Sequence, residues 1–271
     1  MSDAEKRWVL PPQPRTIRKF DRYPALKQNW TFSVEFLKHV SSKCAGNLSD
    51  NVETIAMAGS FGRLEGSRES DADYIMVVKN PEHDLVPRDS AVLFGKYSEY
   101  VIGDSDKEFT FLMNDLMRYF RFICVNYQSN FWRQNEQWAL RNLKLRHSRI
   151  VMYSGLLFLL GEASKHNGPT KISTVTDHLP HTPLERLAWI YEQNHDANFF
   201  RVLGLYNLFV SRLSDKMWRD QLKEVGYEGR YGVPAFAELK ANSDAFIAEF
   251  VRFLFARRHK WSDRFFEYLF F

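Results

Sequence analysis

Hydrophobic residues recur at two different spacings along the chain, and the change between them predicts its organisation. Residues 29–44 have apolar side chains at three- and four-residue steps, which predicts a helix capped by Asn29 or Thr31. Two short apolar runs, 52–58 and 74–78, follow and indicate β-strands. Beyond the second run the helical spacing continues in nearly every segment, so the chain changes from mixed to helical structure.

Helix-start signals divide the second part into separate helices. The predicted helices cover residues 87–102, 114–127 with Asn114 and Asp115 as caps, 138–163, 182–194 with Thr182 as cap and Pro183 first, 243–260 and 262–271. The expected fold class is therefore α+β, with a small α/β domain on a short mixed sheet followed by an all-helical domain. The boundaries are an N-terminal arm at 1–25, the α/β domain at 26–110 and the helical domain at 111–271.

Composition indicates a folded protein, because 45% of the residues are hydrophobic and 26% are charged. The aromatic share is 15%, with 23 Phe, and predicts bulky helix-packing cores. The net charge of +4 does not by itself indicate a nucleic-acid partner.

The cysteines and the hydrophobic segments indicate the cellular compartment in which the protein is expected. The two cysteines, Cys44 and Cys124, are expected to be buried small hydrophobes rather than a disulfide framework. The chain opens without an apolar leader, and residues 150–161, its longest apolar stretch, are too short to span a bilayer. We therefore expect a cytoplasmic protein with no membrane partner.

One stretch carries candidate chemistry, "AGSFGRLEGSRESDADYIMVV" at residues 58–78. Gly59 has no Cβ and lets a phosphate approach the backbone, and Ser60 offers a hydroxyl and an N–H as donors. Asp71 and Asp73 are two residues apart, so on a strand both side chains would share one face. Such a face suits Mg²⁺ or Mn²⁺ bridging a bound nucleoside triphosphate. The simpler alternative is a strand–turn–helix with solvated aspartates.

These residues resemble the signature of the nucleotidyltransferase superfamily, which has the polymerase-beta-like fold. The string looks closest to the branch with the bacterial uridylyltransferases of the PII signal protein and their uncharacterised relatives. The matching positions are Gly59, Ser60, Gly62, Arg63, Glu65, Ser70, Asp71 and Asp73. The resemblance implies an ATP- or NTP-binding enzyme that transfers a nucleoside monophosphate to a hydroxyl acceptor and releases pyrophosphate. It slightly favours a protein acceptor, with a small molecule or RNA left open.

The resemblance also implies roles for individual residues. Asp71 and Asp73 would be catalytic and hold the metal, and the remaining contacts would bind nucleotide. The nucleotide-binding candidates are Gly59, Ser60, Gly62, Arg63 and, from the helical domain, Arg141 and Lys144. Pairs of basic residues on one helix face, such as Arg118 and Arg121, are otherwise explained as solvated surface.

A third acid, which the superfamily usually supplies from another strand, cannot be chosen among Asp89, Asp104, Asp106 and Glu108. Residues 108–113 alternate like a strand but equally lead into the helix that follows. Two alternatives therefore stay open beside the enzyme. One is a weakly active or inactive nucleotide-binding or interaction module, and the other is a toxin or defence nucleotidyltransferase acting on tRNA.

Overall fold

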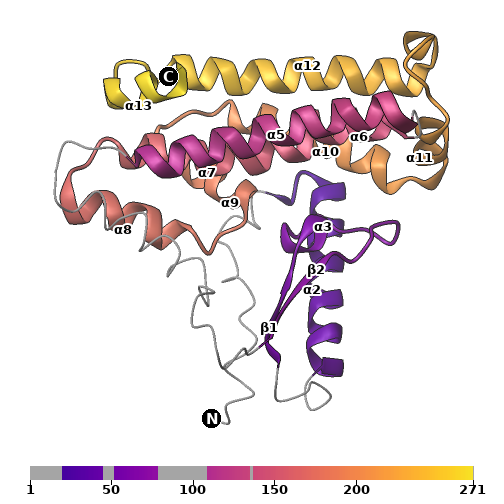
Figure 1. Cartoon of the computed structure of the whole chain (residues 1–271), viewed down its shortest axis with the longest axis horizontal. Coiled ribbons are helices and arrows are strands. Elements are labelled where there is room, and N and C mark those ends of the chain that lie inside the picture. The colour runs from indigo at the N-terminus through magenta and orange to yellow at the C-terminus, as the bar shows by residue number, and fades with distance from the viewer. Residues whose placement is uncertain (1–19, 45–51, 79–108, 135–136, 271) are drawn as a thin grey trace. The chain divides into compact units, whose positions relative to one another are not determined.

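The computed structural model describes residues 20–44, 52–78, 109–134 and 137–270 (Figure 1). The chain divides into two compact units, Met1–Arg88 and Asp89–Phe271. The division falls in a segment outside the described residues, so the predicted domain boundary at residue 110 stays a prediction. Most of the predicted N-terminal arm and the helix predicted over 87–102 also lie outside them.

The first unit contains one long helix and a pair of strands. Its elements are α2 (Pro24–Cys44), β1 (Val52–Met57), α3 (Gly59–Gly62) and β2 (Tyr74–Val78). The strands pair antiparallel, with Met57 opposite Tyr74 and an irregularity near Val52. One further backbone hydrogen bond, from Ala58 N to Asp73 O at 2.8 Å, extends the pairing beyond the strand ends. The strand pair therefore ends at two residues of the predicted motif, Ala58 and Asp73.

The predicted α+β fold class is wrong. The described part of the chain is about 75% helical and essentially all-helical, and its only strands are the two-stranded pair of β1 and β2. The segment that alternates like a strand contributes no strand where it is described, because α5 (Thr110–Gln134) begins within it. Phe109 and Met113 are both buried, which their four-residue spacing on a helix also explains.

The second unit is built from helices joined by short connections (Figure 1). After α5 come α6 (Trp138–Lys144), a π-helical turn η2 (Leu145–Arg149), α7 (Ile150–Ala163), α8 (Gly168–His178), α9 (Pro183–Gln193), α10 (Phe199–Ser214), α11 (Lys216–Lys223), a 3₁₀ turn η3 (Arg230–Gly232), α12 (Pro234–Phe255) and α13 (Asp263–Phe270).

The core of this unit surrounds α7, which is buried over most of its length and packs against α8 and α9. Aromatic rings from distant parts of the sequence stack there. The ring of Phe253 on α12 lies 3.9 Å from that of Tyr191 on α9 and 5.2 Å from that of Phe158 on α7, measured between centroids. The large phenylalanine content thus supplies the helix-packing core that composition predicted.

The single long helix predicted over 138–163 is interrupted by η2. His147, in the middle of η2, is fully buried, and its ring stacks on Phe209 at 4.1 Å. Its Nδ1 donates to Leu143 O at 2.9 Å, so its Nε2 must accept from the Asn242 amide, also at 2.9 Å. The imidazole competes for a helix carbonyl, which accounts for the local widening. Burial lowers the pKa of His147 to about 4.

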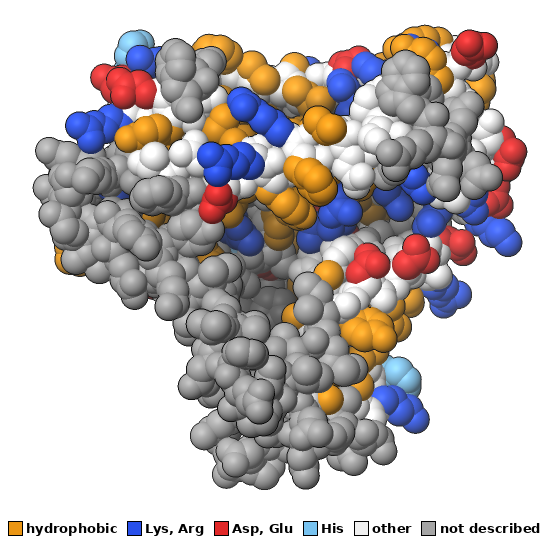
Figure 2. Space-filling view, viewed as in Figure 1, with side chains coloured by type: hydrophobic (Ala, Val, Ile, Leu, Met, Phe, Trp, Pro, Cys, Tyr) orange, Lys and Arg blue, Asp and Glu red, His pale blue; other side chains and the backbone are white. Residues whose placement is uncertain are grey.

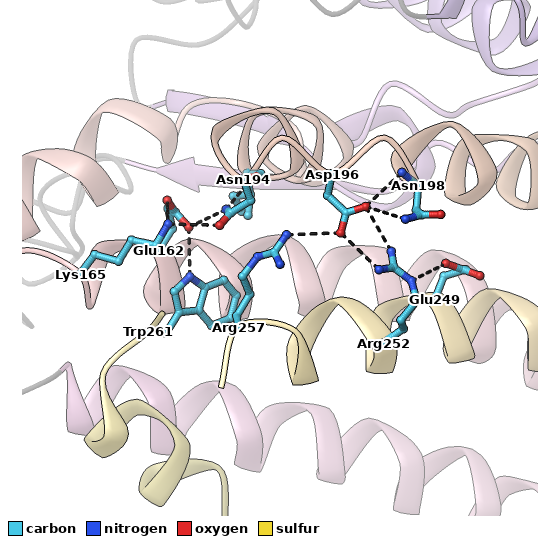
Figure 3. A network of polar contacts seen from close by, with 10 residues as sticks. Glu162, Lys165, Asn194, Asp196, Asn198, Glu249, Arg252, Arg257 and Trp261 are labelled. Atoms are coloured by element: carbon cyan, nitrogen blue, oxygen red, sulfur yellow. Dashed lines mark hydrogen bonds and ion pairs between the residues drawn. The ribbon is translucent and has the colours of Figure 1, made fainter. Parts of the chain in front are cut away.

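Two buried carboxylates connect the helices of the second unit (Figure 3). Glu162 accepts from Trp261 Nε1 at 3.0 Å and from Asn194 Nδ2 at 2.9 Å. Asp196 accepts from Arg252 and Arg257, each at 3.3 Å. Every charge in this network faces an opposite charge or a hydrogen-bond donor, so its role is to hold α7, α9, α12 and the start of α13 together.

Helix-start predictions have different outcomes. The start of α9 is confirmed, because Thr182 accepts from Glu185 N and Glu185 returns a bond to Thr182 N, forming a capping box. The start predicted for α12 at Ser243 is wrong, since the helix begins at Pro234. Ser243 is instead buried and accepts from Arg146 Nε at 2.8 Å.

Among the described residues, no helix combines the length and the apolar character that crossing a membrane requires. Both cysteines are free thiols, and both are half-buried rather than fully buried as predicted.

Candidate active site

The antiparallel pairing of β1 and β2 brings the Gly-Ser pair and the second aspartate of the motif together. Gly59 has φ +60, in the left-handed region, and a Cβ built on it would lie 2.2 Å from Asp73 Oδ2. The carboxylate of Asp73 therefore rests directly against the Gly59 backbone, which only glycine permits. Residues that are fourteen positions apart in the sequence thus form one small site at the open end of the strand pair.

The polar groups of this site are available for binding. Asp71 and Asp73 are exposed and lie just before β2, so the prediction that they share the face of a strand is wrong. Ser60 is half-buried in α3. Within the described part of the chain, no basic side chain pairs with either aspartate and no hydrogen bond occupies the Ser60 hydroxyl. The Asp73 carboxylate lies against the Gly59 backbone, and Asp71 precedes it by two residues, so these acids are candidates for holding a divalent cation.

The turn that follows Ser60 is tightly braced. Glu65 N donates back to Ser60 O at 2.9 Å. Leu64, between them, has φ +59 although it is a bulky residue and only 4% exposed. Such a backbone costs on the order of 1–2 kcal/mol and persists only where its surroundings hold it. The strain lies within five residues of Gly59, at the site itself.

Helix α2 supplies that support. Asn29 Nδ2 donates to Glu65 O at 3.1 Å, and Gly66 N donates to Ser33 Oγ at 2.9 Å. Below the turn, Phe61 stacks on Phe36 of α2 with a centroid distance of 4.2 Å. Sequence analysis assigned Asn29 to a helix cap and gave Ser33 no role. A buried polar residue on the same helix face four positions later is the signal that could have connected them to a partner.

Arg63 does not extend freely toward the site. Its Nε donates to Glu65 Oε2 at 2.9 Å, and the two side chains are only 13% and 7% exposed. The other carboxylate oxygen of Glu65, Oε1, is buried without a hydrogen-bond partner among the described residues. Arg63 and Glu65 therefore form a mostly buried pair beneath the turn, and the role of Arg63 as a nucleotide contact stays a prediction.

Gly62 has a packing role within the first unit. A Cβ on Gly62 would lie 2.4 Å from Met57 O, so the glycine lets α3 approach the end of β1. This close packing is sufficient reason for a glycine at position 62. The predicted role of Gly62 in binding nucleotide stays a prediction.

The remaining predicted residues lie elsewhere. Arg141 and Lys144 are half-buried on α6, in the second unit, and their predicted contact with nucleotide stays a prediction. The candidates for a third acid, Asp89, Asp104, Asp106 and Glu108, lie outside the described residues. In the described ranges, no group of three or more His, Cys, Asp or Glu side chains is placed to hold a metal ion.

The comparisons with known proteins identify no relative of this chain. No protein-family model matches the chain, and no curated protein or solved structure matches it.

Proposed function

We propose that this protein is a metal-dependent nucleotidyltransferase that moves a nucleoside monophosphate from a nucleoside triphosphate to a hydroxyl acceptor. The observation that supports the proposal is the packing of the Asp73 carboxylate against the backbone of Gly59, next to Ser60. This contact supports the functional interpretation of a motif that resembles a nucleotidyltransferase signature in sequence.

The donor set fits Mg²⁺ or Mn²⁺, because Asp71 and Asp73 are exposed carboxylates without a basic partner among the described residues. These hard oxygen ligands suit a cation that keeps further positions for water and phosphate oxygens. When bound, the cation would offset the charge that develops on the transferred phosphoryl group.

The chain's own residues have distinct roles in this proposal. Asp71 and Asp73 would hold the cation, Gly59 gives the Asp73 carboxylate room against the backbone, and the Ser60 hydroxyl donates to a phosphate oxygen. The acceptor oxygen forms a bond to the α-phosphorus while the bond to the β-phosphate oxygen breaks. Pyrophosphate leaves, and the acceptor proton passes to solvent. The two free thiols agree with a cytoplasmic location, which we propose for the reaction.

Incubation with each labelled nucleoside triphosphate and Mg²⁺, with and without cell extract, tests the proposal. We expect pyrophosphate release and label transfer that both disappear in Asp71→Asn and Asp73→Asn. Glu69→Gln is the matched control, because Glu69 is an exposed acid in the same connection and should keep full activity. Transfer that survives both aspartate substitutions would refute the assignment. Nucleotide binding without any transfer would favour a nucleotide-binding module instead.

A further inference from the structure

The net positive charge of this protein lies in α5–α7, where few acidic residues accompany the Lys and Arg residues. Residues 110–163 contain seven Lys and Arg and three Asp and Glu, whereas the whole chain contains 37 and 33. The remaining residues therefore contain 30 of each, and the entire formal excess of +4 belongs to this one segment. The small net charge of the whole chain therefore comes from a segment of the helical unit that is poor in acidic residues.

The exposed side of α5 combines this charge with aromatic rings. Arg118, Tyr119, Arg121 and Phe122 lie within one arc of the helix, and we call these four residues the α5 face. The Arg118 side chain is 81% exposed, and Tyr119 and Phe122 are 51% and 67% exposed. Figure 2 shows basic and hydrophobic side chains next to one another along the helix that Figure 1 labels α5.

Arg118 and Arg121 differ from the arginines of the network in Figure 3. Arg252 and Arg257 bind Asp196, whereas no carboxylate among the described residues pairs with Arg121. Arg118 has only a loose pair with Asp115 at 3.8 Å, in which both side chains are exposed. Such a pair contributes little and yields readily to a stronger anion.

We propose that the α5 face binds a single-stranded nucleic acid. Arginines without tight acidic partners meet backbone phosphates, and the exposed rings of Tyr119 and Phe122 provide surfaces on which bases stack. An acidic segment of a protein would satisfy the charges, but a single strand also supplies successive flat bases for Tyr119 and Phe122, so the combination favours the nucleic acid. Resting on the proposed function, the terminal hydroxyl of that strand is the acceptor of the nucleoside monophosphate.

Fluorescence anisotropy of the full-length protein with a labelled single strand of ~12 nucleotides tests the binding. Phe122→Ala should weaken binding about tenfold, the loss expected for one stacked base. The double variant Arg118→Gln, Arg121→Gln should also reduce the slope of log affinity against log salt by ~1.4, about 0.7 for each phosphate contact.

Two matched controls separate a local effect from a general one. Phe255→Ala removes a ring that is 69% exposed on α12, and Arg264→Gln removes an exposed cation from α13. Both should bind the strand as the unaltered protein does. The proposal is overturned if the α5-face variants bind like these controls, if polyglutamate binds as tightly as the strand, or if a duplex binds equally well.

The acceptor assignment has its own readout. A strand ending in a 3′-hydroxyl should receive label from the nucleoside triphosphate, and one ending in a 3′-deoxy sugar should not. Asp73→Asn should bind the strand normally and transfer nothing. A strand that binds but stays unlabelled while another acceptor is labelled overturns the acceptor assignment alone. If no acceptor is labelled at all, the proposed function fails, and the anisotropy result still decides the binding.

Discussion

Replacing Gly59 by alanine perturbs the site at its closest contact. Alanine at φ +60 is strained by on the order of 1 kcal/mol. In addition, the new Cβ would lie 2.2 Å from Asp73 Oδ2, whereas ordinary contact begins at 3.4 Å. The Asp73 carboxylate must therefore move by about 1 Å. A displacement of that size in a catalytic group costs about 100-fold in rate, so we expect nucleotidyl transfer to fall by about that factor.

The chain offers a matched control for the backbone strain. Gly229 has φ +70, and nothing lies within 4 Å of a Cβ built on it. Gly229→Ala should therefore lose about 1 kcal/mol of unfolding free energy in its own unit and keep full activity.

Pyrophosphate release at saturating nucleotide and urea denaturation, measured on both variants, separate strain from the contact with Asp73. Activity of Gly59→Ala within about twofold of that of Gly229→Ala would refute the reasoning. It would show that the contact of the new Cβ with the Asp73 carboxylate does not affect the reaction.

Three further predictions follow from the structure. Glu65→Gln and Arg63→Gln should each increase hydrogen exchange at the Glu65 amide, and Glu69→Gln should not; unchanged exchange would show that the pair does not brace the turn. Because the pKa of His147 is lowered to about 4 in the folded chain, its contribution to stability is present above its unfolded pKa and is lost as pH falls. The unfolding free energy should drop by about 2 kcal/mol between pH 7 and pH 5 on this account, and His147→Gln should remove most of that drop in urea titrations. Thr182→Ala should cost about 1 kcal/mol in thermal unfolding through loss of the capping box, whereas Ser173→Ala, an exposed helix position, should cost much less.

Local signals in the sequence predicted local structure well. The start of α9 is determined by three residues within four positions, Thr182, Pro183 and Glu185. No distant contact is needed to predict it. The Gly-Ser pair and the aspartates are likewise separated by a single short connection. The contact of Gly59 with Asp73 follows from the pairing of two adjacent strands.

Predictions that depended on distant contacts failed. Ser243 resembled a helix cap, but its partner Arg146 lies 97 positions earlier and keeps it inside α12. Asn29 resembled a cap as well, and its amide bonds Glu65 in the turn instead. The mixed sheet was expected from the two apolar runs at 52–58 and 74–78, which form only a two-stranded pair. A further strand was considered over residues 108–113, a spacing that a helix beginning at Thr110 satisfies equally. Periodicity over so few residues does not distinguish the two.

Binding of Mn²⁺, followed by the loss of its free electron paramagnetic resonance signal, tests the central claim most directly. In the presence of a non-hydrolysable nucleoside triphosphate, we expect the unaltered protein to bind Mn²⁺. Asp71→Asn and Asp73→Asn should each weaken that binding by at least ~10-fold, a loss that even outer-shell substitutions produce at metal sites. Glu69→Gln should bind as the unaltered protein does. Equal Mn²⁺ binding by all four proteins would contradict a cation site at Asp71 and Asp73.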